Sequence, residues 1–109
     1  MACLTCPDIL HSMQYMKALL VIREKEVREG FVVERVVWQL SAPLPGCVHP
    51  FKYRLYCGRG GKTVVRYDNE SGKGDHRHAG HREHEAPYAF TSLESLMADF
   101  EMDVRKAME

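Results

Sequence analysis

The segment KALLVIREKEVREGFVVERVVWQL, residues 17–40, decides the fold. Its second half is rich in β-branched residues and alternates between two faces. One face carries Val32, Glu34, Val36, Trp38 and Leu40, and the other carries Phe31, Val33, Arg35 and Val37. Gly30 supplies a turn, so residues 17–27 and 31–40 are predicted to form a β-hairpin. The charges at the end of residues 17–27 also suit a helix, but the β-rich partner favours a strand. Trp38, which lies among valines, is expected to be a packing residue.

A second hairpin follows a proline-containing loop. Pro43 and Pro45 exclude a central strand from residues 41–46. In the run FKYRLYC, residues 51–57, Phe51, Tyr53, Leu55 and Cys57 alternate with Lys52, Arg54 and Tyr56, as in a half-buried antiparallel strand. Three glycines in residues 58–62 then close the turn to TVVRYDN, residues 63–69.

The C-terminal segment has the pattern of an amphipathic helix. Thr91 and Glu94 have the spacing of a capping box. An apolar stripe at helical spacing follows, made of Leu93, Leu96, Met97, Phe100 and Val104. With residues 70–86 read as a polar loop, the predicted fold is α+β. It consists of a four-stranded antiparallel sheet from two successive hairpins, with the C-terminal helix packed on one face.

The composition bounds what kind of protein this is. A chain of 109 residues with 45% hydrophobic and 28% charged residues suits a single globular domain. Fifteen basic residues balance fifteen acidic ones, so net charge predicts neither nucleic-acid nor membrane binding. No apolar run reaches the length of a membrane span, and the start MACLTCPDIL lacks the basic and long apolar regions of a signal peptide. A cytoplasmic protein with reduced cysteines is therefore expected. Residues 1–15 differ in character from the rest and are expected to be an extension outside a single domain at residues 16–109.

Candidate chemistry gathers where the second hairpin ends. The candidates are Arg66, Asp68, Lys73, Asp75, His76 and His78. Arg66 can bind a phosphate bidentately and Lys73 can do so as a point charge. Gly72 and Gly74 would let backbone N–H groups approach the same anion. A solvated loop at a strand end is the plainer interpretation of this stretch.

The same unit holds the parts needed to cleave a phosphodiester without a metal. An imidazole titrates near neutral pH, so His76 can serve as general base or acid with His78 as its partner. Either Asp68 or Asp75 could orient an imidazole and fix its tautomer. Lys52 and Arg54 lie in a strand that interleaves basic and aromatic residues, as RNA-binding surfaces often do.

Two metal sites are alternatives. His76, His78, His81 and His84 fall within nine residues, and His76 and His78 would share one side of an extended segment. Neighbouring basic residues oppose a cation there. Cys3 and Cys6 form a CxxC that could combine with Cys47 and His49 in a Cys₃His zinc site, but one CxxC alone is a weak signal. Neither a metal nor another cofactor is therefore expected.

Several of these stretches also resemble a known family. They are MKALLVIREKEV, VVWQL, PLPGCVHPFKY, RYDN at residues 66–69, GKGDHRH at residues 72–78, Pro87-Tyr88 and Ala98-Asp99-Phe100. The chain is similar in them to TumE-type toxins of bacterial toxin–antitoxin pairs. His81 and His84 depart from the family pattern, which weakens the four-histidine metal site.

The resemblance implies a growth-inhibiting toxin. Its partner would be an antitoxin, typically a helix-turn-helix protein encoded by the adjacent gene, and RNA cleavage is the implied activity. A homodimer is left open, and no membrane association is expected. Two other functions compete with a ribonuclease toxin: a binding module for nucleic acid or antitoxin without turnover, and a histidine-rich metal-binding regulator.

Overall fold

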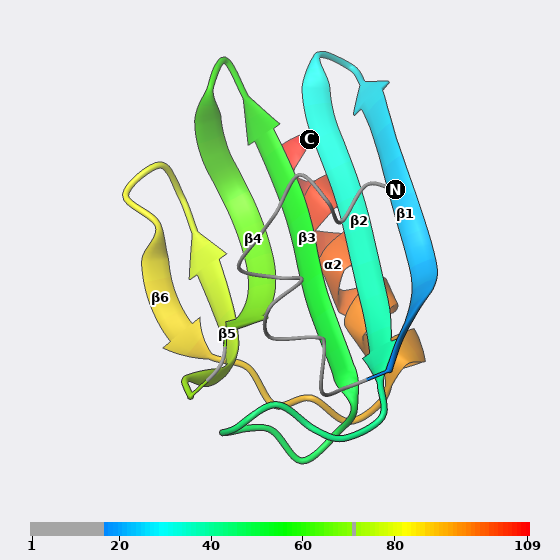
Figure 1. The fold of residues 1–109 in the computed structure, drawn as a ribbon. Helices are drawn as coiled ribbons and strands as arrows, with labels where there is room; N and C mark the ends of the chain where they lie inside the picture. The colour runs from blue at the N-terminus through cyan, green and yellow to red at the C-terminus, as the bar shows by residue number, and fades with distance from the viewer. Residues whose placement is uncertain (1–16, 71) are drawn as a thin grey trace.

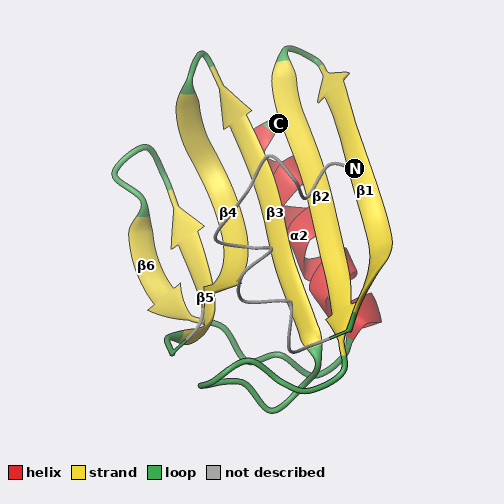
Figure 2. Ribbon diagram, in the orientation of Figure 1, coloured by secondary structure: helices red, strands yellow, loops and turns green. Residues whose placement is uncertain are grey.

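The computed structural model describes residues 17–70 and 72–109. In these residues six strands form one sheet, in which each strand pairs antiparallel with the next along the chain (Figure 1). The strands are β1 (Ala18–Arg28), β2 (Phe31–Leu40), β3 (Phe51–Arg59), β4 (Lys62–Glu70), β5 (Gly74–Ala79) and β6 (His84–Pro87). The helix α2 (Leu93–Ala107) crosses one face of the sheet, behind β2 and β3 in Figure 2. The predicted α+β class and the C-terminal helix on an antiparallel sheet are confirmed.

The core lies between α2 and the sheet. Val33, Leu55 and Phe100 are fully buried there. Phe31, Val33 and Val37 lie on the covered side, so the alternation read from residues 31–40 places the apolar members of one face in the core. We call the side of the sheet that faces α2 the covered face. The opposite side, on which no helix of the described residues packs, we call the open face.

The predicted strand number of four is wrong, because residues 74–87 form a third hairpin. β5 pairs with β4 over six registered positions, from Glu70↔Gly74 to Val65↔Ala79, and β6 pairs with β5. Gly80 and Glu83, both at positive φ, make the turn between them. Polar side chains stand on both faces of this hairpin, so it carries no apolar period that would reveal strands.

The start of α2 is set by one serine. Ser92 is the N-cap, and its side-chain oxygen accepts a hydrogen bond from the Ser95 N–H at 3.0 Å. The cap therefore lies one residue after the predicted Thr91. No helix among the described residues has the length and apolar content needed to cross a membrane.

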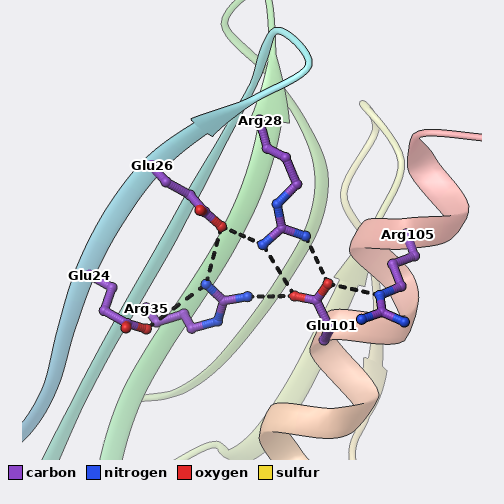
Figure 3. A network of polar contacts seen from close by, with 6 residues as sticks. All are labelled: Glu24, Glu26, Arg28, Arg35, Glu101 and Arg105. Carbon is purple, nitrogen blue, oxygen red and sulfur yellow. Dashed lines mark hydrogen bonds and ion pairs between the residues drawn. The ribbon is translucent and has the colours of Figure 1, made fainter.

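An ionic network fastens α2 to β1 and β2 on the covered face (Figure 3). Glu101 accepts hydrogen bonds from Arg35 at 2.6 Å and from Arg28 at 2.7 Å. The Arg35 side chain is only 12% exposed, and its guanidinium lies over the Phe100 ring. A charge can occupy this covered position because Glu101 supplies a partner for it.

Candidate functional site

Cross-strand register gathers polar residues on the open face. One row runs Glu34, Tyr56, Arg66, His78 and Glu85 across β2 to β6, and the next runs Val36, Arg54, Asp68, His76 and Pro87. Directly opposed residues in a sheet share a face, so these side chains lie side by side. The structure thus brings Arg54, Arg66, Asp68, His76 and His78 together, with Lys52 two residues along β3 from Arg54.

Two carboxylates flank the histidine pair. His78 Nε2 lies 3.5 Å from Asp68 Oδ1, and its Nδ1 lies 3.9 Å from Glu85 Oε1. Glu85 also reaches His76, whose Nε2 is 3.3 Å from Oε2. The two imidazole centroids are 6.3 Å apart. This arrangement offers two proton-transfer groups on one face, each beside a carboxylate.

Arg66 is held by two carboxylates. Its Nε donates to Asp68 Oδ2 at 3.0 Å, and its Nη1 donates to Glu83 Oε1 at 2.6 Å. Asp68 therefore stands between Arg66 and His78. A guanidinium already paired twice has to give up a partner before it can bind a phosphate, so the geometry favours Arg66 as a support for Asp68.

Asp75 belongs to a different cluster. Its carboxylate is on the covered face, where Oδ1 accepts from the Tyr53 hydroxyl at 2.5 Å and pairs with His49 Nε2 at 2.8 Å. Burial and the hydrogen bond to Asp75 raise the pKa of Tyr53. Strand alternation separates Asp75 from its neighbour His76, so of the two aspartates expected to orient an imidazole, only Asp68 lies beside His76 and His78.

Cys47, His49 and Asp75 offer ligand atoms within 4.8 Å of one another. The Phe51 N–H donates to His49 Nδ1 at 3.2 Å, which assigns the ring proton to Nε2, where it is donated to Asp75. A metal at Nε2 would have to displace that proton. His49 also stacks on Phe90 at 3.6 Å between centroids, so the hydrogen bonds and packing favour a structural role. Burial and the nearby Asp75 carboxylate raise the pKa of Cys47. Cys3 and Cys6 lie outside the described residues.

The remaining predicted residues lie apart from the histidine pair. His84 is paired with Ala79, and alternation turns its side chain away from the face that Glu85 shares with His76 and His78. His81 is in the turn before β6, so the structure does not bring the four histidines together. Lys73 lies in the turn before β5. The Gly72 N–H of that turn donates to Pro45 O at 2.8 Å, which takes one of the expected anion donors.

Two residues of the open face were missed in the sequence, and a third, which was expected to pack, is partly exposed there. Glu83 and Glu85 were expected to lie in a loop, and only an alternation match between residues 74–79 and 84–87 could have placed Glu85 beside the histidines. Trp38, expected to be a packing residue, has its registered partner in Lys52 and lies partly exposed on the open face. Its alternation with Val37, which is fully buried, was the available signal.

Fold and site together define a small α+β protein with a meander sheet, one helix and a cluster of histidines, carboxylates and arginines on the open face. The chain belongs to the TumE toxin family, because the family model described as Toxin TumE matches residues 8–108, nearly the whole chain. Comparison with curated proteins and with solved structures gave no match. Family membership supports a toxin role in a toxin–antitoxin system. The match includes residues 8–15, and the domain start at residue 16 stays a prediction.

Proposed function

We propose that this toxin cleaves RNA, without a metal, at the histidine pair on the open face. The observation that carries the proposal is the pair itself. The ring centroids of His76 and His78 are 6.3 Å apart, and the carboxylates of Asp68 and Glu85 flank the two rings. Such a spacing lets the two imidazoles contact different oxygens of one phosphate group. Histidine is the side chain best suited to exchange protons at neutral pH.

The reaction is an internal transesterification. One imidazole, His76, takes the proton of a ribose 2′-OH as the 2′-oxygen attacks the adjacent phosphorus. The bond from phosphorus to the 5′-oxygen breaks, and the protonated His78 gives its proton to that leaving oxygen. The products are a 2′,3′-cyclic phosphate and a 5′-hydroxyl, and one proton has been taken up and one released. Asp68 Oδ1 lies 3.5 Å from His78 Nε2 and can hold the ring in position, while Nδ1, at 3.9 Å from Glu85, lies beyond hydrogen-bond distance and can give its proton to the leaving oxygen.

Cations must balance the charge that develops on the phosphate. Arg54 is next to Asp68 in the same cross-strand row, and Lys52 lies two residues before Arg54 in β3. Arg66 contributes indirectly, since it holds Asp68 in place. Lys73, in the turn before β5, remains a proposed phosphate contact at the edge of the face.

The test compares histidines from a single tract. Purified wild type, His76→Ala and His78→Ala proteins are incubated with single-stranded RNA in the presence of a chelator, and cleavage is followed on gels. His81→Ala and His84→Ala are matched controls, because neither side chain lies beside the pair. We expect loss of at least about 100-fold in rate for the first two variants and little change for the controls. RNA ends carrying 2′,3′-cyclic phosphate are also expected. Equal cleavage by His76→Ala, His78→Ala and wild type would rule out the assignment.

A second proposal concerns the partner. We infer that the cognate antitoxin, a helix-turn-helix protein from the adjacent gene, binds the edge of β1 that pairs with no other strand of residues 17–70 and 72–109. This strand has eleven residues and exposes Leu19, Leu20, Val21 and Val27. An exposed strand edge can accept a strand from another chain. Co-expression of the adjacent gene should relieve toxicity and yield a complex that Leu19→Asp weakens; an undiminished complex would place the interface elsewhere.

Pairing of β1 with a second copy of itself is less favourable. When two copies of β1 pair antiparallel, directly opposed residues share a face. Residues of one strand that share a face are an even number apart, so the numbers of two opposed residues must sum to an even value. Centring the pair on Glu24 sets Glu24 against Glu24 and Arg23 against Lys25, and centring it on Lys25 sets Lys25 against Lys25. Like charges directly opposite destabilise a sheet, so this edge suits a different partner better than a homodimer.

A further inference from the structure

A groove lies beside the histidine cluster on the open face. It has a volume of about 210 Å³ and is lined by Val36, Trp38, Lys52, Tyr53 and Arg54. Trp38 of β2 is registered against Lys52 of β3, and Val36 against Arg54. The groove thus has an aromatic and an aliphatic side chain on one strand and two cations on the next. It is smaller than the roughly 300–1,000 Å³ typical of sites for drug-sized ligands, so a single planar ring suits it better than a large molecule.

The two cations of the groove are not neutralised within the described part of the chain. Neither Lys52 nor Arg54 has a carboxylate partner among residues 17–70 and 72–109. Arg54 lies over the Tyr56 ring at 5.0 Å, which leaves its N–H groups without an acceptor in that contact. By contrast, Arg35, Arg66 and Arg77 each bind a carboxylate. Proteins that bind single-stranded nucleic acids combine cations, which contact the phosphates, with aromatic rings, which stack on the bases.

The groove and the proposed reaction site are linked by Arg54. Arg54 lines the groove and also stands in the row that leads through Asp68 to His76. Three strand spacings and two residues separate Trp38 from His76, which corresponds to about 16 Å along the sheet. A strand of RNA a few nucleotides long can therefore contact both places.

We propose that this groove binds an unpaired nucleobase of RNA, with Trp38 stacking on the base and Lys52 and Arg54 holding the flanking phosphates. The inference rests on the proposed function and adds a substrate class, single-stranded RNA. A base within a duplex is stacked on its neighbours and is not free to enter such a recess. Duplex RNA would reach the cations but leave Trp38 uncovered.

The single tryptophan of the chain gives a direct readout. A short single-stranded RNA with 2′-O-methyl riboses, which cannot supply the attacking 2′-OH, is titrated into the protein while the emission of Trp38 is recorded. We expect saturable quenching by the single strand, and weak or no quenching by the same sequence as a duplex or by an oligonucleotide that is abasic throughout. Quenching that is equal for the abasic and normal oligonucleotides would overturn the proposal.

Variants measure the strength of each contact. Stacking of one base is worth about 1–3 kcal/mol, so Trp38→Ala should weaken binding of a labelled single strand about 5- to 150-fold, with Trp38→Phe between it and wild type. Lys52→Gln and Arg54→Gln should weaken binding and lessen its salt dependence. Lys25→Gln is the matched control: its register with Glu34 puts it on the same face but away from the groove. Unchanged affinity in folded Trp38→Phe, Lys52→Gln and Arg54→Gln proteins would refute the base site.

Two further results separate this inference from the proposed function. Quenching that persists while His76→Ala cleaves like wild type would leave the base site standing and remove the catalytic assignment. Quenching by purified antitoxin, with none by RNA, would assign the groove to the protein partner and overturn the inference.

Discussion

Replacing Glu101 with glutamine tests how α2 is held on the sheet. The substitution keeps the shape of the side chain and removes the charge that Arg28, Arg35 and Arg105 share (Figure 3). The bond to Arg35 is the most shielded, and turning a charged hydrogen bond into a neutral one there costs about 1–1.5 kcal/mol. The contacts to Arg28 and to the exposed Arg105 add about 0.5 and 0.3 kcal/mol. We therefore expect the free energy of unfolding to fall by about 2 kcal/mol at neutral pH.

The same loss should depend on pH in a defined direction. Hydrogen bonds from Arg28 and Arg105 hold the pKa of Glu101 below its ordinary value of 4.5, against burial, which raises it. A carboxylate with a lowered folded-state pKa stabilises the protein above its unfolded-state pKa, and this stabilisation is lost as pH falls through the folded-state value. The difference between wild type and Glu101→Gln should be complete at neutral pH and shrink below about pH 4.5.

Urea denaturation followed by circular dichroism, repeated at several pH values, measures both quantities. Glu94→Gln is the control, since Glu94 is on the same helix and exposed, and its replacement should change the free energy of unfolding by no more than about 0.5 kcal/mol. A Glu101→Gln effect below about 0.5 kcal/mol, or one of equal size at acid and neutral pH, would refute the reasoning.

Two other substitutions test the assignments of residues outside the open face. Asp75→Ala removes the acceptor of Tyr53 and His49 and should lower stability by about 2–4 kcal/mol, while RNA cleavage per folded molecule stays near wild type. Loss of cleavage at unchanged stability would return Asp75 to the catalytic group. Ser92→Ala should lower the free energy of unfolding by about 1 kcal/mol through loss of the helix cap, and Thr91→Ala by less than about 0.5 kcal/mol. The opposite ranking in thermal or urea melts would restore the cap to Thr91.

Local patterns predicted the parts of the fold that rest on apolar periodicity. Residues 31–40 alternate cleanly, and the structure buries Val33 and Val37 as that alternation requires. The stripe of α2 buries Leu96, Phe100 and Val104, all named in advance. The two hairpins before residue 70 were predicted for the same reason, since the burial period and the glycine turns are both encoded by neighbouring residues.

The third hairpin, residues 74–87, has no apolar periodicity from which it could be predicted. Its strands β5 and β6 carry polar residues on both faces, and what holds His76, His78 and Arg77 in place are partners from other strands and from α2. Arg77, for example, donates to Asp103 at 3.0 Å. A strand stabilised by polar partners distant in the chain looks like a loop in the sequence.

The candidate site likewise has features that the sequence predicted and features that only the tertiary structure determined. Sequence alone grouped Arg66, Asp68, Lys73, Asp75, His76 and His78, because they are close in the chain. With residues 70–86 expected to be a loop, that grouping did not separate Asp75 from His76. Only the tertiary structure decided which face α2 covers, and with it that Asp75 binds Tyr53 while the histidines share the open face with Glu85 and Arg54. Short motifs were enough to predict the family, whereas the groove at Trp38 could be found only from the register of β2 and β3, which places Trp38 opposite Lys52. Periodicity is a property of neighbouring residues, but which side of a sheet is covered depends on the packing of a helix far along the chain.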